Sequence, residues 1–105
     1  MIVTFEKEYL RNLYETGKPG DKKHRFPPEI VRKYVRCIDL LLDASDINTL
    51  FGIHSLNYER LKGDKAGISS IRVNKQYRIE FMVTDDGIDT VVTVCSILEL
   101  SNHYT

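Results

Sequence analysis

The chain has 105 residues, which is enough for one domain with a modest core and too few for two. We therefore treat residues 1–105 as a single domain. Hydrophobic residues make up 42% and charged residues 29%, as in an ordinary soluble globular protein, and no apolar run reaches membrane-spanning length. The N-terminus, MIVTFEKEYL, lacks the layout of a signal peptide, so a cytoplasmic protein with no membrane partner is expected.

The formal net charge of +0 conceals an uneven distribution along the chain. Residues 18–36 and 56–81 are rich in lysine and arginine, whereas residues 37–55 and 82–105 contain acids and neither Lys nor Arg. Such segregation makes a basic surface possible on a neutral protein, and basic surfaces attract polyanions. Chance clustering of surface charge is the alternative.

The first part of the chain predicts a strand followed by two helices. Ile2–Phe5 is short, apolar and β-branched, and from Glu6 the apolar residues recur at helical spacing until Gly17. A second helix begins at Pro27-Pro28-Glu29 and continues to about Ala44. Its apolar stripe consists of Ile30, Tyr34, Cys37, Ile38, Leu41 and Leu42.

A basic loop, GKPGDKKHR, joins the two helices and is punctuated by Pro19 and Gly20. It is either a solvated connector, which is the more common case, or a loop that contacts phosphate. After the second helix, Ser45 begins a short turn in which Ile47, Leu50 and Phe51 are expected to attach the connector to the core.

The second half of the chain predicts strands. Residues 58–61, 68–73, 77–81 and 88–98 have strand-like patterns, and Thr84-Asp85-Asp86-Gly87 is typical of a hairpin turn. Because residues 88–98 are apolar on both faces, that strand is expected inside the sheet. A strand, two helices and about four further strands define an α+β fold with helices against an antiparallel sheet.

The hairpin of Ile68–Val73 and Tyr77–Phe81 has a register that its polarity determines. A two-residue turn would mix polar and apolar side chains on both faces. A three-residue turn places Val73 opposite Tyr77, Ile71 opposite Ile79 and Ser69 opposite Phe81 on one face. Burial of one face fixes register, so we predict the three-residue turn.

This register places Arg72 directly opposite Arg78 on the other face of the hairpin. Like charges across a strand pair are destabilising by about 0.2–1 kcal/mol. Two interpretations remain open: Glu80, a diagonal neighbour of Arg72, neutralises the pair, or the two guanidinium groups await an anion such as phosphate.

Several catalytic motifs are absent from the sequence, including glycine-rich nucleotide loops, metal-ligand spacings and nucleophile motifs. Cys37 and Cys95 lie far apart in apolar patterns, so buried thiols are predicted rather than a disulfide or metal site, and no cofactor is expected. The remaining chemistry is basic and aromatic, which suits RNA: Tyr58, Lys62, Lys65, Arg72, Tyr77, Arg78, His103 and Tyr104. Cleavage through the 2′-OH needs no metal, and His103 and Tyr104 could transfer protons unless they form a frayed tail.

The segment from Tyr58 to Asp64, the runs SIRVN (residues 70–74) and YRI (residues 77–79), and the closing His103-Tyr104 closely resemble the HigB killer proteins of the RelE-like toxin superfamily. The resemblance implies a RelE-like α+β fold, with two N-terminal helices on a twisted, mainly antiparallel sheet of about four to five strands. It also implies a ribosome-dependent, metal-independent mRNA endonuclease that acts at the decoding site. A helix-turn-helix antitoxin of the HigA kind would neutralise it and link it indirectly to operator DNA.

The resemblance also assigns roles to residues. Lys62 matches an active-site lysine, Arg78 an arginine on the scissile phosphate, and Arg72 a second basic position. His103, with Tyr104 or Glu59, is expected to handle protons. Glu59 replaces a histidine of some members, Asn102 replaces a C-terminal acid, and His103 and Tyr104 are in exchanged order. The predicted RNA-binding residues are Arg60, Lys65, Arg72 and Tyr77, with Tyr58 or Tyr77 either stacking on a base or packing in the core.

These departures keep two alternatives open. A family member that has lost cleavage would act only as a module that binds antitoxin, ribosome or DNA. An unrelated α+β interaction protein would carry the Arg72–Arg78 pair without a function.

Overall fold

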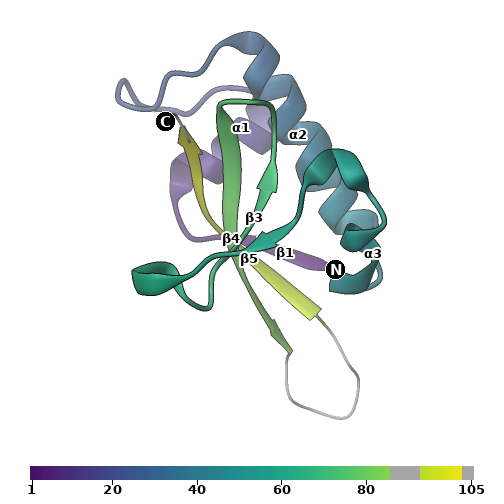
Figure 1. Cartoon of the computed structure of the whole chain (residues 1–105). Coiled ribbons are helices and arrows are strands. Elements are labelled where there is room, and N and C mark those ends of the chain that lie inside the picture. Colours follow the sequence, from purple (N-terminus) through teal and green to yellow (C-terminus); the bar gives the residue numbers. More distant parts are fainter. Residues whose placement is uncertain (86–92, 103–105) are drawn as a thin grey trace.

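The computed structural model describes residues 1–85 and 93–102. Within these residues, three α-helices lie against one face of a five-stranded sheet, which confirms the predicted α+β architecture (Figure 1). None of the helices in this part of the chain combines the length and the apolar character needed to cross a bilayer.

The sheet has the strand order β1-β5-β4-β3-β2. The strands are β1 (Ile2–Phe5), β2 (Glu59–Arg60), β3 (Ser69–Arg72), β4 (Tyr77–Asp85) and β5 (Thr93–Asn102). β1 pairs with β5 in parallel, and every other pairing among the described strands is antiparallel. β5 therefore lies inside the sheet, as its apolar character predicts. It extends to Asn102, four residues beyond the predicted end. Of the predicted turn at 84–87, Thr84 and Asp85 belong to β4, and residues 86 and 87 lie outside the described residues.

The predicted register of the hairpin is confirmed. Arg72 pairs with Arg78, Ile71 with Ile79 and Ser69 with Phe81. The Val73 N–H donates to the Tyr77 carbonyl at 2.9 Å, so three residues form the turn. Ile71, Ile79 and Phe81 are fully buried, which is why a one-residue slip is not tolerated.

The first two helices bury an apolar stripe against this face of the sheet. α1 (Glu8–Thr16) buries Tyr9, Leu10 and Leu13, and it ends at Gly17, whose φ of 77° is accessible mainly to glycine. α2 (Pro28–Asp43) begins with Pro28 in its first turn, as predicted. Its buried stripe is Ile30, Tyr34, Cys37, Ile38 and Leu41.

Two predicted core contacts of this region are wrong. Leu42 is 41% exposed because it is rotated by one residue, about 100°, away from Leu41 at the centre of the stripe. The connector after α2 forms a short helix, α3 (Ile47–Phe51), in which Leu50 is buried but Phe51 is 51% exposed. A helix of this length directs only one side to the core, and Asp46 caps it by accepting from the N–H groups of Asn48 and Thr49.

The buried thiol predicted at Cys37 is confirmed. Its side chain is 6% exposed, and burial raises its pKa to about 11. A thiol of that kind packs as a small apolar group and is a poor nucleophile at neutral pH. The Cys95 side chain lies outside the described residues.

Candidate active site

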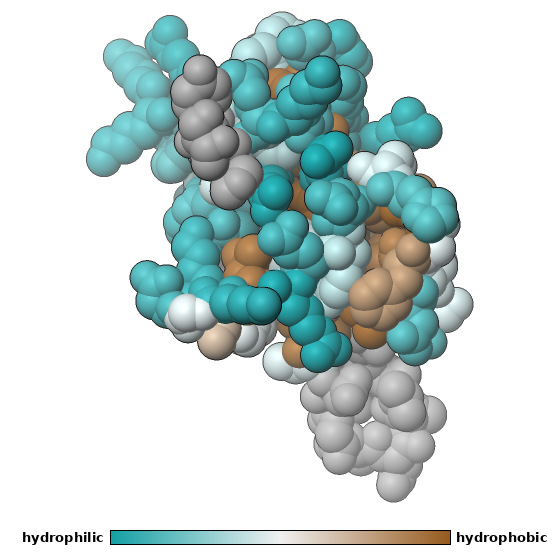
Figure 2. All heavy atoms as spheres, viewed as in Figure 1, coloured by the Kyte–Doolittle hydropathy of each residue, from teal (hydrophilic) through white to brown (hydrophobic). Residues whose placement is uncertain are grey.

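A hollow of about 230 Å³ lies on the face of the sheet opposite the helices. β2 and β4 provide Glu59, Arg78 and Glu80, and the segment between β2 and β3 closes the hollow with Leu61, Lys62, Asp64 and Lys65. The face turned toward the viewer in Figure 2 carries mostly hydrophilic side chains. The hollow is thus a polar site formed by the basic segment of residues 56–81.

Strand pairing explains why these side chains meet. Glu59 pairs with Ser70, and Ser70 pairs with Glu80, so the two carboxylates and the serine form a row across three strands. Ser70 is 1% exposed and short, so it leaves room above it for the longer side chains of its neighbours. Arg78 lies two residues from Glu80 and therefore projects from the same face.

Two ion pairs span the hollow. The Arg78 guanidinium donates to the Glu59 carboxylate at 3.3 Å, and the Lys65 ammonium lies 2.9 Å from a Glu80 carboxylate oxygen. The Arg78 side chain is 18% exposed and that of Glu80 is 12% exposed, whereas Lys65 and Glu59 are more open to solvent. The hydrogen bond that Lys65 donates to Glu80 raises the pKa of Lys65, so this side chain is a fixed cation at neutral pH.

This pairing corrects the proposed neutralisation of the two arginines by Glu80. Glu80 binds Lys65, and it also accepts a hydrogen bond from the Ser101 hydroxyl at 3.4 Å. Glu59 is the partner of Arg78. Arg72 has no carboxylate partner within the described part of the chain, because Glu80 extends toward the 62–65 segment instead.

The structure brings together four of the predicted site residues and places Arg60, Arg72 and Tyr77 outside the hollow. Glu59, Lys62, Lys65 and Arg78 line the hollow. Arg72 lines a different hollow of about 300 Å³, where Lys33 and Arg36 of α2 accompany it.

Arg60 and Tyr77 also lie outside this hollow. Arg60 pairs with Ser69, so it lies on the opposite side of β2 from Glu59. Tyr77 makes an edge contact with Phe26 at 5.7 Å and packs against the core, which matches the packing alternative for this ring. His103 and Tyr104 lie outside the described residues.

Three residues of the hollow were absent from the predicted site: Leu61, Asp64 and Glu80. Glu80 was detectable, because it lies two residues from Arg78 in a strand and so shares its face. Leu61 and Asp64 belong to the LKGD run. Leu61 lies just before a 3₁₀ turn, Gly63–Lys65, and Asp64 lies inside it, so no strand or helix periodicity predicts where their side chains point.

A second polar cluster lies where α1 meets β5. The Tyr9 hydroxyl donates to Glu99, which also pairs with Lys7 at 2.6 Å. The Tyr9 ring stacks on His24 at 3.7 Å, and His24 is held by Asp21 at 2.9 Å. Burial raises the pKa of Tyr9, and the hydrogen bond to Glu99 adds to that shift.

This cluster fixes the basic loop to the body of the protein. Asp21 accepts hydrogen bonds from the backbone N–H groups of Lys23 and His24 as well as contacting the His24 ring. The hydrogen bonds from His24 lower the pKa of Asp21. The loop is therefore anchored at His24, while Lys18, Lys22, Lys23 and Arg25 are exposed to solvent, as expected of a solvated connector.

Among the residues described, no group of three or more His, Cys, Asp or Glu side chains is arranged to hold a metal ion. The chemistry on the open face is that of cations paired with carboxylates.

Several solved structures share this fold. The chain matches the YoeB/ParE toxin from Agrobacterium tumefaciens with a TM-score of 0.57 and 19% identity, covering 99% of this chain and 100% of that one. It matches a YafQ mutant from E. coli with a TM-score of 0.59 and 14% identity, over 95% and 90% of the two chains. At these identities the comparison shows the fold alone.

Sequence comparison gives the family. The profile described as "RelE-like toxin of type II toxin-antitoxin system HigB" matches residues 3–93. Toxin HigB-1 of Vibrio cholerae is 35% identical over 86 residues, which are 81% of this chain and 86% of that protein. An uncharacterized protein of Haemophilus influenzae is 28% identical over 86% of this chain and 91% of its own length. The chain belongs to the HigB family of type II toxins, and the alternative of an unrelated interaction protein is wrong.

Proposed function

We propose that this toxin is a ribosome-dependent endoribonuclease that cuts mRNA at the decoding site through the ribose 2′-OH, without a metal ion. One observation carries the proposal: Arg78 and Glu59 are in contact at 3.3 Å in a hollow that two lysines also line. Metal-independent phosphodiester transfer uses a group that takes a proton and cations that stabilise charge on the phosphate, and a carboxylate, a guanidinium and two ammonium groups can fill these two roles.

Arg78 and the lysines act on the phosphate. Because most of its side chain is shielded from solvent and a carboxylate orients it, Arg78 is preorganised to receive the charge that develops on the phosphate oxygens. Lys65, held by Glu80, and Lys62, which has no carboxylate partner in the described residues, bind the neighbouring phosphates. Arg72 lines the neighbouring hollow with Lys33 and Arg36, and these three cations would bind phosphates further along the RNA.

Glu59 is the favoured general base. It accepts the 2′-OH proton as the 2′ oxygen bonds to phosphorus, and the bond from phosphorus to the 5′ oxygen breaks. His103 or Tyr104 supplies the proton that the leaving 5′ oxygen takes. The products are a 2′,3′-cyclic phosphate and a 5′-hydroxyl end, so no co-reactant is needed.

The partners follow from the family. A heterotetrameric YoeB–YefM toxin-antitoxin complex from Staphylococcus aureus has a related fold, with a TM-score of 0.53 and 21% identity, which supports an antitoxin partner here. We propose a helix-turn-helix antitoxin of the HigA kind, which binds operator DNA and carries the toxin with it. The complex would form in the cytoplasm, where the ribosome is the target.

The test is cleavage of a defined mRNA on programmed ribosomes in the presence of a chelator. Fragments with cyclic phosphate ends, formed only when ribosomes are present, are expected. If the purified toxin binds ribosomes and leaves the mRNA intact, the alternative of a binding module without catalysis replaces the proposal.

A further inference from the structure

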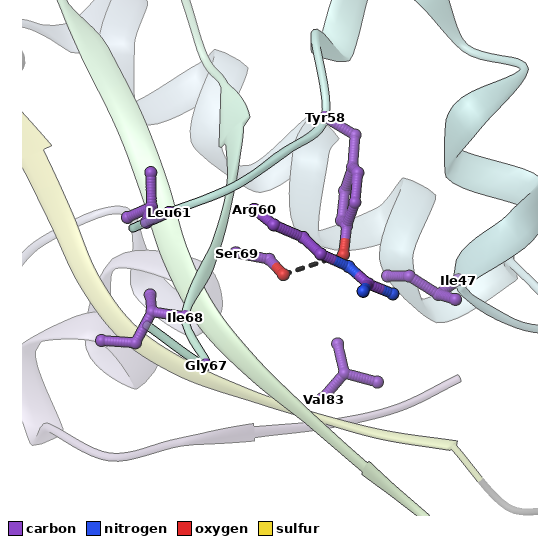
Figure 3. A pocket seen from close by; sticks show the side chains of 8 residues that line it. All are labelled: Ile47, Tyr58, Arg60, Leu61, Gly67, Ile68, Ser69 and Val83. Carbon is purple, nitrogen blue, oxygen red and sulfur yellow. Dashed lines mark hydrogen bonds between the residues drawn. The ribbon is translucent and has the colours of Figure 1, made fainter. Parts of the chain in front are cut away.

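A second hollow, of about 340 Å³, lies on the opposite side of β2 from the candidate active site. Figure 3 shows Ile47, Ile68 and Val83 among its lining side chains, with Arg60, Tyr58 and Ser69 as the polar members. Helix α3, the edge strand β2, β3 and β4 all contribute to it. It combines an apolar floor with one cation.

Arg60 is the cation of this hollow. Among the side chains that the structure describes, no carboxylate pairs with its guanidinium, in contrast to Arg78 and Lys65 on the other face. Its pairing with Ser69 directs it away from Glu59 and so away from the candidate active site. A cation beside apolar side chains is suited to a carboxylate that arrives with an apolar neighbour.

The walls of the hollow are preformed. The Tyr58 hydroxyl and the Ser69 hydroxyl are hydrogen-bonded at 2.8 Å, drawn as the dashed line in Figure 3. The Tyr58 ring is fixed by an edge contact with Phe51 at 4.8 Å and a tilted contact with Phe81 at 6.1 Å. A preformed hollow loses little entropy when it is filled. The half-exposed Phe51 adds apolar surface beside it.

The location is accessible to an extended segment. β2 is the last strand of the sheet, so a partner reaches Arg60 without displacing a described strand. Leu61 lines both hollows. A partner bound in the second hollow would therefore contact the segment that carries Glu59 and Lys62 of the candidate active site.

We propose that this hollow is a docking site for the antitoxin, which inserts an apolar side chain over Ile47 and Ile68 and places a carboxylate on Arg60. The apolar floor favours protein over RNA, because phosphates gain nothing from apolar contact and the cations for RNA lie on the other face. The inference rests on the antitoxin partner of the proposed function and not on RNA cleavage. An antitoxin bound there would contact the toxin on the side of β2 opposite the candidate active site.

The experiment measures the affinity of the purified toxin for the antitoxin encoded beside it, by titration calorimetry. Arg60→Glu and Ile47→Asp are each expected to weaken binding by at least about tenfold, because each leaves one group of the partner buried without its counterpart. Arg32→Glu, the same charge reversal on an exposed position of α2, is the matched control and is expected to leave affinity unchanged. Hydrogen exchange of the wild-type complex needs no variant and is expected to show protection of residues 58–61 and 67–69.

Three results would overturn the proposal. The first is unchanged affinity in both variants with no protection of those residues. The second is a loss of antitoxin affinity in Arg60→Glu but not in Ile47→Asp, which would indicate general charge attraction without an apolar side chain bound in the hollow. The third is retained antitoxin affinity with lost ribosome binding in Arg60→Glu, which would make the hollow an RNA contact. A failure of mRNA cleavage changes none of these measurements.

Discussion

Replacement of Arg78 by alanine removes the group that is proposed to stabilise charge on the scissile phosphate. Loss of one preorganised donor of this type costs about 2.7–4 kcal/mol of transition-state stabilisation, which is roughly a hundred- to a thousandfold in rate. The fold is expected to survive, because Arg78 projects from the open face while its neighbour Ile79 fills the core. The ion pair with Glu59 is partly exposed, and such pairs contribute about 0–1 kcal/mol to stability.

The assay is single-turnover cleavage of mRNA on programmed ribosomes, with ribosome binding measured separately. An interaction made mainly in the transition state lowers the rate at saturating toxin and leaves binding nearly intact. Arg78→Lys is expected to restore little activity, because an ammonium lacks the planar fork that contacts two oxygens at once.

Arg72→Ala is the matched control for this prediction. Arg72 is the same residue type, directly opposite Arg78 in the register, but it lines another hollow and has no carboxylate partner in the described residues. It is expected to weaken ribosome binding while the rate at saturation stays near that of the wild type. An equal loss of the saturated rate in both variants, or cleavage by Arg78→Ala within about threefold of the wild type, would refute the reasoning.

The remaining predictions concern proton transfer and stability. Glu59→Gln retains an oxygen that can accept from Arg78 but cannot take a proton, so the saturated rate is expected to fall by about 10²–10⁴-fold, and a full rate would remove Glu59 as the base. Truncation after Asn102 deletes His103 and Tyr104; it should leave ribosome binding and slow cleavage if the tail supplies the acid, and full activity would exclude that role. Ile79→Ala empties a fully buried position and is expected to cost about 2–5 kcal/mol of unfolding free energy in denaturant titrations, whereas a cost below about 1 kcal/mol would show that the core collapses around it. Glu99 has a pKa below its ordinary 4.5, because hydrogen bonds from Lys7 and Tyr9 outweigh the opposing effect of burial. Its contribution to stability is therefore present above pH 4.5 and is lost as the pH falls through its lower folded pKa, so Glu99→Gln should flatten the acid side of the stability curve.

Local patterns predicted the hairpin and the helices well, because burial of one face constrains each of them. The alternation around Ile71 and Ile79 admits one register, and the stripe of α2 admits one orientation. Leu42 shows the limit of this reasoning. An apolar residue next to the last residue of a buried stripe can still point toward solvent, as Leu42 does.

The candidate site was only partly predictable. The family motif and strand parity were sufficient to group Arg78 with Lys62, but the partner of Arg78 depends on the pairing of β2 with β3. That two-residue strand has no periodicity of its own, so nothing local distinguishes the face of Glu59 from that of Arg60. The parallel pairing of β1 with β5 joins residues at opposite ends of the chain and is likewise outside the reach of local patterns.

The Arg78–Glu59 pair presents an apparent conflict, because a guanidinium already bound to a carboxylate has less to offer an arriving phosphate. In the proposed reaction the conflict resolves during the chemical step. As Glu59 takes the 2′-OH proton, its negative charge disappears and its attraction for Arg78 weakens. At the same moment negative charge builds on the phosphate oxygens, so the guanidinium transfers its interaction from the base to the reacting group. The pair thus holds both residues in place before reaction and makes the contact with phosphate strongest in the transition state, which is the difference that accelerates a reaction. On this argument the two residues act as one unit, and Arg78→Ala combined with Glu59→Gln should slow cleavage by far less than the product of the two single effects.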